Sequence, residues 1–399
     1  MISIETAREK ILLPLVPLGP EILAVSHAAG RVLAGPILAR RTQPPADVSA
    51  MDGYAVRSTD AAAPRQIIGS APAGHPFAGS VGQNQAVRLF TGSVIPPGAD
   101  AVLLQEDAVC AGDTLTPTTA ITAHQHIRPQ GQDFATGTAL LAAGRVLTSR
   151  DIGLAAAANH PWLTVHRRPR VAILSTGDEI ALPGEPIPTG GIVSSNSAML
   201  AALINAAGGD PIVLPNVADS PAAIADAIRG TGAIDLLVTT GGASVGDHDA
   251  VRAGLDQLGF ALGFWKIAMR PGKPMIFGHL GATPVLGLPG NPVSAFVCAV
   301  LFLLPALWRL GGRASTALLT ERAILGADLR ANDHRADHLR ATLLQNESGA
   351  WIVTANARQD SAMMRVLAAA DALILRPPHA PAAAAGTQVP IIRLSTLGI

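Results

Sequence analysis

Three polar segments follow predicted strands in the second half of the chain, and together they could bind an anion and a cation. They span 175–179, 239–249 and 287–294. Glycines in the second segment let backbone amides approach an anion closely, and its carboxylates, with Glu179, offer the oxygen ligands that Mg²⁺ prefers. Each segment alone also fits an ordinary turn or a helix cap. Their convergence at one edge of one sheet indicates a ligand site.

A fourth segment, Arg270-Pro271-Gly272-Lys273-Pro274, could supply positive charge. The chain has only three lysines, so a lysine in a rigid turn of proline and glycine is unusual for this composition. The segment is not a Walker A loop, because GxxxxGK[ST] is absent. We interpret Lys273 as a positioned cation for an oxyanion, with a solvated turn lysine as the alternative.

Other chemistries lack their signatures. His334 and His338 are four residues apart, and His124 and His126 are two apart, but no HExxH motif surrounds either pair. The GxGxxG motif is absent as well. Aromatic residues make up 3% of the chain, which argues against an aromatic platform for nucleic acids.

Length and composition predict a multidomain protein of the cytoplasm. The chain has 399 residues, 49% of them hydrophobic, and its 29 basic and 29 acidic residues give a net charge of zero. That balance disfavours nucleic acid and anionic membranes as partners. Cys110 and Cys298 exclude a disulfide framework and indicate a reducing compartment. The apolar run 295–308 contains Pro305 and is shorter than the roughly 20 residues of a membrane span, so we expect a buried helix.

The distribution of apolar runs and turn residues predicts four domains. Strands at 171–175, 211–214, 235–239 and 285–288 alternate with helices at 195–207, at 221–229 and after Asn291. This alternation predicts a doubly wound α/β domain with a parallel sheet over 169–313. A β-rich domain is expected at 41–135, inserted into a helical linker domain made of 1–40 and 136–168, and a small β domain at 314–399.

Read together, these segments and several shorter ones resemble the MoeA-type molybdopterin molybdenumtransferases, the bacterial relatives of the gephyrin E domain. The resemblance starts at Pro44-Pro45-Ala46-Asp47-Val48-Ser49-Ala50-Met51-Asp52-Gly53-Tyr54-Ala55. It continues in the family's order through Thr91-Gly92, 97–102, Gly131-Gln132-Asp133, 175–179, 241–246, 271–274 and 288–294. It covers nearly the whole chain and is weakest after residue 314.

The resemblance implies an enzyme that inserts molybdenum from molybdate into adenylylated molybdopterin and releases AMP, assisted by Mg²⁺ or a similar cation. It implies an elongated homodimer, in which the β-rich domain of one subunit closes the site of the other. The α/β domain would resemble that of the MogA-type adenylyltransferases. Docking with the molybdopterin adenylyltransferase and with proteins that mature molybdoenzymes is consistent with this pathway.

The matched positions carry over as follows. The acidic catalytic set is Asp52, Asp133, Glu179, Asp219 and Asp249, of which Glu179, Asp219 and Asp249 would bind the metal. The substrate-binding set is Thr91, Ser175, Thr176, Gly177, Gly241, Gly242, Ser244, Arg270, Lys273, Pro289, Asn291, Pro292, Ser294, Arg335, Arg340 and Ser361.

The sequence departs from the family at four of these segments. Ala46, Gln132, Ala243 and Arg270 stand where the family commonly has Phe, Glu, Val and Lys. Gln132 lacks the negative charge that Glu would place beside Asp133. Arg270 keeps the positive charge of Lys but carries it on a planar guanidinium instead of a compact ammonium group.

Three alternatives stay open on the sequence. A molybdopterin adenylyltransferase would match 169–312 but would not explain the β-rich insert. A scaffold protein that reuses the fold would not need the acidic set. A CinA-like nucleotide hydrolase would share only the α/β segment.

Overall fold

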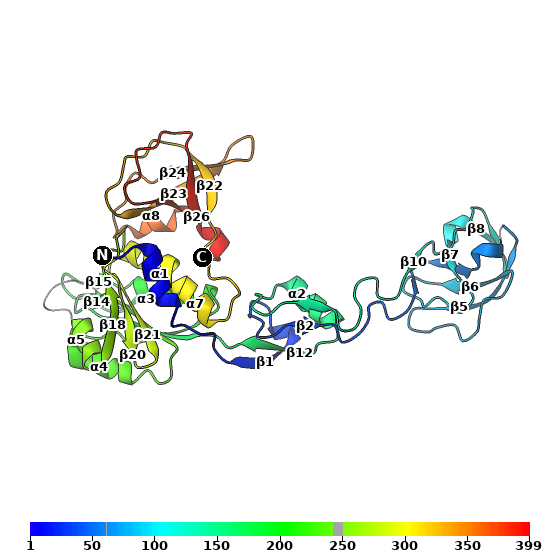
Figure 1. Ribbon diagram of the computed structural model, residues 1–399, viewed down its shortest axis with the longest axis horizontal. Coiled ribbons are helices and arrows are strands. Elements are labelled where there is room, and N and C mark those ends of the chain that lie inside the picture. Colours follow the sequence, from blue (N-terminus) through cyan, green and yellow to red (C-terminus); the bar gives the residue numbers. More distant parts are fainter. Residues whose placement is uncertain (61, 242–249) are drawn as a thin grey trace.

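The computed structural model describes residues 1–60, 62–241 and 250–399. The molecule is elongated (Figure 1). The α/β domain and the C-terminal β domain lie together at one end, and both chain termini lie there too. A narrow waist leads from them to the β-rich domain at the other end.

The α/β domain contains a six-stranded sheet of order β16-β13-β17-β21-β20-β18. Its strands are β13 (Arg170–Ser175), β16 (Asp210–Val213), β17 (Leu236–Thr240), β18 (Phe260–Trp265), β20 (Ile276–Leu280) and β21 (Thr283–Leu288). The first four strands of that order are parallel, as predicted. Strand β20 was not among the predicted strands, and it runs antiparallel to both neighbours. Only two residues join β20 to β21, and a parallel pair would need a long crossover.

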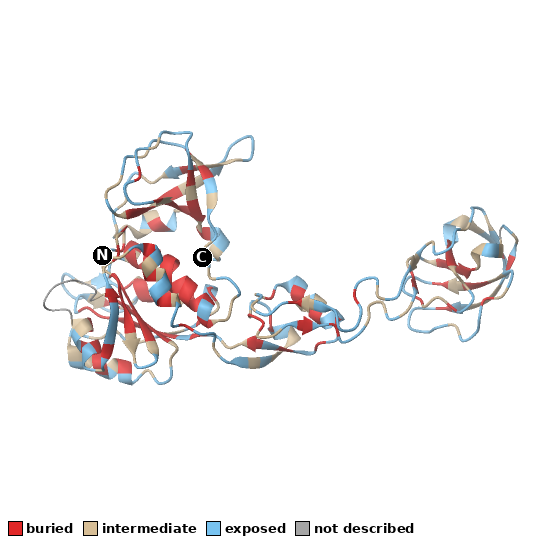
Figure 2. Cartoon of the chain, viewed as in Figure 1, coloured by how far each residue is buried: buried red, intermediate tan, exposed pale blue. Residues whose placement is uncertain are grey.

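Helices cover both faces of this sheet. Val171 and Ile173 of β13 pack on one face with α1 (Ile4–Leu12), α3 (Asn196–Ala206), α6 (Pro292–Cys298) and α7 (Leu304–Leu310). Ala172 and Leu174 pack on the other face with α4 (Pro221–Arg229) and α5 (Ala250–Asp256). Because side chains alternate along a strand, this division shows a sheet buried on both sides, which Figure 2 displays as red strands between helices.

Helix α1 departs from the expected grouping. Its buried residues Ile4, Ala7 and Ile11 belong to the core of the α/β domain and not to the linker. The helix ends at Leu12, and the prolines at 14, 17 and 20 prevent its continuation into the waist. Within the segment 1–40, which was expected to be helical, the α-helix that forms is Ile4–Leu12.

The helix after Asn291 is longer than the apolar run suggested. It continues from Pro292 to Leu310, and 94% of its most apolar 18-residue window is buried inside the protein. Pro305 does not end it, because a π-helical turn over Ala299–Leu303 precedes the proline. Pro305 lacks the N–H that would bond the Leu301 carbonyl, and Arg8 Nε lies 3.4 Å from that oxygen.

The waist consists of two segments that pair with each other. Strand β1 (Pro20–Ala24) runs antiparallel to β12 (Trp162–His166), and β2 (Ile37–Leu38) pairs with β11 (Ala139–Leu141). Helix α2 (Ser149–Ala157) completes a small core with these strands. The linker expected to be helical is thus mainly a pair of two-stranded ribbons.

The β-rich domain is built on a six-stranded sheet of order β7-β4-β6-β5-β9-β8. Its strands are β4 (Gly53–Val56), β5 (Arg65–Ala71), β6 (Gln85–Leu89), β7 (Ala101–Leu104), β8 (Ala108–Ala111) and β9 (Thr114–Pro117). A short ribbon of β3 (Val48–Ser49) and β10 (Ile127–Arg128) adjoins it.

The C-terminal domain is a closed sheet, because β23 pairs with both β24 and β25. Its strands are β22 (Glu321–Leu325), β23 (Ala336–Gln345), β24 (Trp351–Ala355), β25 (Ala372–Arg376) and β26 (Gln388–Arg393). Helix α8 (Met364–Ala368) lies between β24 and β25 in the sequence. Strand β19 (Met269–Arg270), contributed by the α/β domain, pairs with β23 and so joins the two domains.

Candidate functional site

The order of the parallel strands creates a ligand crevice at one edge of the sheet. The chain leaves β13 for β16 on one side and then returns to β17 on the other side. Connections that diverge in this way open a crevice at the carboxyl ends of the two strands. Ser175 and Thr240, the last residues of β13 and β17, lie in register. The first two polar segments predicted from the sequence therefore meet.

Glycine is required where these segments cross. Gly241 has φ +98°, and a Cβ there would lie 2.9 Å from the Thr176 carbonyl oxygen. Gly177 has φ +146°, and a Cβ there would lie 2.7 Å from the Ile180 side chain. Gly241 brings backbone close to the backbone of Thr176, and Gly177 brings backbone close to the side chains of Glu179 and Ile180, as the sequence suggested for an anion site.

Hydroxyl and amide side chains tie the start of α3 to the ends of these strands. Ser175 Oγ lies 2.6 Å from Ser197 Oγ. Asn196 Nδ2 donates to Thr240 Oγ1 and to the Gly290 carbonyl, both at 2.7 Å. Asn196 was not predicted as a site residue, because an asparagine at a helix start usually indicates only a cap.

Three carboxylates gather beside the crevice: Asp178, Glu179 and Asp219. Asp178 Oδ1 accepts a hydrogen bond from the Asp219 backbone N–H at 3.2 Å. The pKa of Asp219 is raised, first by its partial burial and further by the charges of Asp178 and Glu179. Within the described ranges no three acidic, histidine or cysteine side chains form a ready metal cage. Asp249, Gly242 and Ser244 lie outside the described residues.

The loop between β21 and α6 touches the C-terminal domain at Ser361. Asn291 Nδ2 donates to Ser361 Oγ at 3.0 Å, and the Val293 N–H donates to the Ser361 carbonyl at the same distance. Pro289 and Ser294 are buried, whereas Asn291 is exposed and Pro292 half-buried. The structure thus brings the expected Ser361 to the third polar segment.

Lys273 is exposed and makes no ion pair with any residue in the described part of the chain. Its turn is anchored from beneath. A Cβ on Gly272 would lie 2.5 Å from Cys298 Sγ, and the Lys273 carbonyl accepts from the Ile267 N–H. The Lys273 ammonium therefore extends from a backbone with little conformational freedom. This arrangement suits a cation that binds an anionic ligand.

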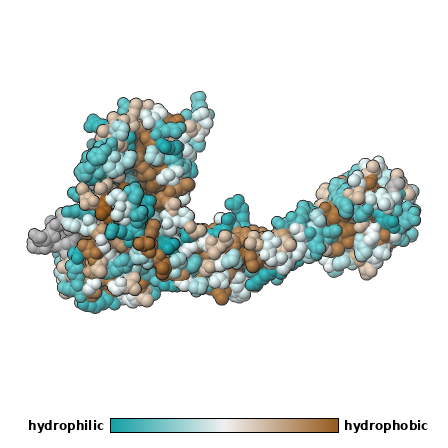
Figure 3. Space-filling model, viewed as in Figure 1, coloured by the Kyte–Doolittle hydropathy of each residue, from teal (hydrophilic) through white to brown (hydrophobic). Residues whose placement is uncertain are grey.

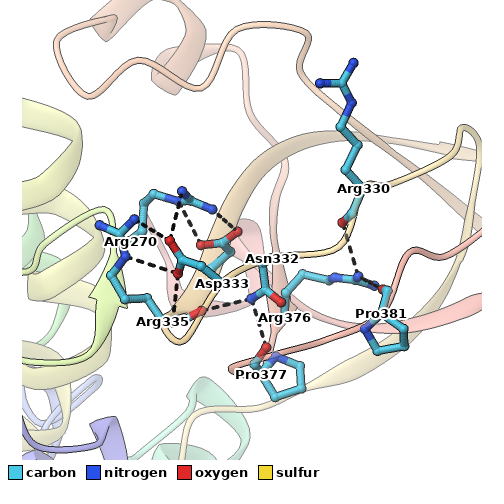
Figure 4. Close-up of polar contacts among 9 residues, drawn as sticks. Arg270, Arg330, Asn332, Asp333, Arg335, Arg376, Pro377 and Pro381 are labelled. Carbon is cyan, nitrogen blue, oxygen red and sulfur yellow. Dashed lines mark hydrogen bonds and ion pairs between the residues drawn. The ribbon is translucent and has the colours of Figure 1, made fainter.

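The three arginines expected to contact oxyanions are already bonded inside the protein. Arg270 forms a two-point ion pair with Asp337, and Arg335 pairs with Asp333 (Figure 4). Arg340 is 1% exposed and donates to Gln359 Oε1 and the Asp360 carbonyl. Arg340 cannot contact a ligand in this arrangement, and Arg270 and Arg335 would first have to leave their carboxylates. The partners of Arg270 and Arg340 lie in distant segments, which sequence spacing could not identify, whereas Asp333 is only two residues from Arg335.

In the β-rich domain, two predicted site residues, Asp52 and Thr91, are hydrogen-bonded to each other. The Thr91 backbone N–H and hydroxyl both donate to Asp52 Oδ1, at 2.8 and 2.9 Å. These bonds, the backbone one first, lower the pKa of Asp52, and the nearby Arg88 adds to the effect. Arg88 was not predicted; its guanidinium lies 4.9 Å from the centre of the Tyr54 ring.

One chain does not bring all predicted residues together. Asp52 lies at the start of β4 and Thr91 follows β6, both in the domain farthest from β13 and β17 (Figure 1). Asp133 is exposed in the segment between that domain and the waist. Of the described members of the acidic set, Asp52 lies in the β-rich domain, Asp133 between that domain and the waist, and Glu179 and Asp219 beside the crevice.

Comparisons with known proteins place each part of the chain. Residues 2–159 match the model of the MoeA N-terminal region (domain I and II), and 172–309 match a probable molybdopterin binding domain. Residues 322–394 match the MoeA C-terminal region (domain IV).

Similar proteins share both sequence and architecture. A molybdopterin molybdenumtransferase of Nostoc is 37% identical over 74% of this chain and 70% of its own length. One from Haemophilus influenzae is 35% identical over 88% of each. The crystal structure of the molybdopterin biosynthesis protein MoeA from Pyrococcus horikoshii superposes with a TM-score of 0.85 at 26% identity, covering 98% of this chain and 99% of that one.

Proposed function

Because the chain belongs to the family of molybdopterin molybdenumtransferases, we propose that the crevice at the carboxyl ends of β13 and β17 is where it acts on its substrate. The protein is a transferase of molybdenum cofactor biosynthesis that inserts molybdenum into molybdopterin. The match of 2–159 to the MoeA N-terminal region disfavours an adenylyltransferase, for which only the α/β domain is needed.

The crevice binds adenylylated molybdopterin through its phosphates. The observation that carries this assignment is the meeting of Ser175 and Thr240 at the switch point of the sheet, with glycine backbone at 177 and 241. Backbone amides there can approach phosphate oxygens, and water is excluded from the buried hydroxyls beneath them. Insertion of molybdenum is coupled to cleavage of the phosphoanhydride and release of AMP.

A divalent cation such as Mg²⁺ fits the carboxylates beside the crevice. Asp178, Glu179 and Asp219 supply hard oxygen donors, and their mutual repulsion contributes to the raised pKa of Asp219. Mg²⁺ is commonly held by one or two carboxylates together with substrate phosphates, so a complete protein cage is not required. When bound, the cation would supply neutralising charge to the phosphate oxygens. Glu179 and Asp219 would hold it, together with Asp249.

Lys273 holds molybdate, the metal-bearing substrate. The oxyanion carries two negative charges, and Lys273 is an exposed cation on an anchored turn with no carboxylate partner among the described residues. Asn291 and Ser361, joined at 3.0 Å, present an amide and a hydroxyl from two domains to the same region of the site.

Two chains form the functional unit. Asp52 and Thr91 lie at the far end of the molecule from Glu179, so a second chain must bring its β-rich domain to the crevice. The waist has exposed apolar side chains that a second chain could cover: Ile22 is 69% exposed and Trp162 60% exposed. Figure 3 shows hydrophobic residues at the surface of the waist.

The setting is the cytoplasm. The expected partners are the adenylyltransferase that makes the substrate and the proteins that mature molybdoenzymes. Binding to nucleic acid or to a membrane is not expected. The neutral net charge supports this assignment.

The test is turnover by the purified protein. Supplied with adenylylated molybdopterin, molybdate and Mg²⁺, it should form cofactor that activates a cofactor-free molybdoenzyme, without consuming ATP. Chelation of the divalent cation should stop AMP release, and added Mg²⁺ should restore it. ATP consumption with molybdopterin as acceptor would instead identify an adenylyltransferase.

A further inference from the structure

Asn196, the first residue of α3, is buried between two walls of the crevice. Its side chain is 8% exposed, and Nδ2 lies 2.7 Å from Thr240 Oγ1 and 2.7 Å from the Gly290 carbonyl oxygen. Thr240 ends β17, and Gly290 lies in the turn between β21 and α6. One amide group therefore bonds to both the second and the third polar segments.

The bonding pattern fixes which atom of the amide faces the crevice walls. The Thr240 hydroxyl donates its hydrogen to the Pro289 carbonyl at 3.5 Å, so it can only accept from Asn196. The Gly290 carbonyl is an acceptor as well. Both positions thus require a donor, and the Asn196 amide has two N–H groups to give.

The turn at Gly290 lies beside the residue that follows β17. A Cβ on Gly290 would be in ordinary van der Waals contact with the Gly241 Cα, at 3.5 Å. The Asn196 amide bonds to both of these segments, through Thr240 and through the Gly290 carbonyl. Asn196 Oδ1 is buried and has no hydrogen-bond partner. The two hydrogen bonds that Nδ2 donates offset the cost of this unpaired acceptor.

We propose that Asn196 is a positioning residue for molybdenum insertion: it holds the 289–291 turn against Thr240, so that both walls of the crevice are placed before adenylylated molybdopterin binds. The inference rests on the proposed function. It concerns binding of the organic substrate, whose crevice is formed by these two walls, and molybdate is kept saturating because Asn291, at the end of the turn, is assigned to the molybdate side.

The test uses two variants and a matched control. Asn196→Asp keeps the shape but sets a carboxylate oxygen against the Gly290 carbonyl, and Thr240→Val removes the hydroxyl link to both partners. Asn205→Asp makes the same chemical change at an exposed position of the same helix. Initial rates are measured against adenylylated molybdopterin at saturating molybdate, with the melting temperature of each protein as a check on folding.

We expect Asn196→Asp and Thr240→Val to raise KM for adenylylated molybdopterin about tenfold, the effect of one lost hydrogen bond, with little change in kcat. The double variant should raise KM less than the product of the single effects, because both changes break the same link. Asn205→Asp should behave as the wild type. If Asn196→Asp fails to fold, the KM of Thr240→Val for adenylylated molybdopterin tests the inference.

Unchanged KM in the folded variants, or loss of kcat and melting temperature alone, would overturn the inference while leaving the proposed function intact. Absence of turnover in the wild-type protein would overturn the proposed function, and the inference with it.

Discussion

Arg270 and Asp337 form a two-point ion pair between neighbouring strands of different domains. Nε donates to Oδ1 at 2.9 Å and Nη2 donates to Oδ2 at 2.7 Å, while β19 and β23 run side by side. The Asp337 side chain is only 7% exposed, and Asp333 lies 3.8 Å from the same guanidinium. Arg270 thus joins the α/β domain to the C-terminal domain, where the sequence alone suggested a cation for the substrate.

Replacing Arg270 should therefore reduce stability more than catalysis. Arg270→Met leaves a nearly buried carboxylate without its main partner, which costs about 1–3 kcal/mol. Urea unfolding should show this loss, and Arg229→Met, which removes an exposed pair with Asp226, should cost less than about 1 kcal/mol. Unchanged stability together with a raised molybdate requirement would return Arg270 to the oxyanion site.

Lys273 should respond in the opposite way. Charge-assisted hydrogen bonds contribute roughly 1.5–3 kcal/mol each, so Lys273→Ala should raise the molybdate concentration for half-maximal insertion about 10- to 150-fold. The fold should persist, because the side chain is exposed. Lys10→Ala, at another exposed lysine, is the control. A folded Lys273→Ala protein with an unaltered molybdate titration would make Lys273 a surface residue.

The waist should lose stability in acid through Asp151. Burial acts to raise its pKa, but hydrogen bonds from Arg145 and Thr148 prevail and lower the pKa to about 2, from 3.8. Its contribution is therefore complete above pH 3.8 and disappears as the pH falls towards 2.

Asp151→Asn should accordingly lower the melting temperature at pH 7, since a lost cap costs about 0.5–2 kcal/mol. The difference from the wild type should shrink steadily below pH 4. Asp226→Asn, on the exposed face of α4, should show neither effect. A difference that is equal at pH 7 and pH 3 would mean that the Asp151 charge does not stabilise the cap.

Sharing of the site between two chains can be tested by complementation. Asp52→Asn and Glu179→Gln should each inactivate the homodimer, because each removes a charge from every site. A mixed dimer would contain one site with both residues intact, so mixing the variants should restore up to about half of the activity per mixed dimer. Mixed dimers that form and stay inactive would show that each chain uses its own Asp52.

The elements with clear boundary signals were predictable from the sequence. Helix α4 begins at Pro221 as expected, and α3 agrees with its prediction to within one residue at each end. Strands β18 and β20 were not predicted, since a glycine interrupts the apolar run of each. Strand β20 forms a hairpin with β21.

The site was predictable in its glycines and carboxylates, but not in its pairings. The structure brings Thr91 to Asp52 and Asn291 to Ser361, pairings between predicted site residues that the resemblance had not specified. Arg270 and Arg340 bond to residues from distant segments of the chain. The sequence alone therefore could not show that both guanidinium groups already have partners inside the protein. Asn196 escaped notice because its chemistry depends on two walls that only the folded chain brings together.

The most direct test of the account measures molybdenum incorporated and AMP released in the same reaction mixture. The wild-type protein, supplied with adenylylated molybdopterin, molybdate and Mg²⁺, should yield one molybdenum in the cofactor for each AMP. Glu179→Gln, an exposed change of charge alone at the crevice, should abolish both products while the protein stays folded. Full molybdenum incorporation by Glu179→Gln would contradict the placement of the reaction at the carboxyl ends of β13 and β17.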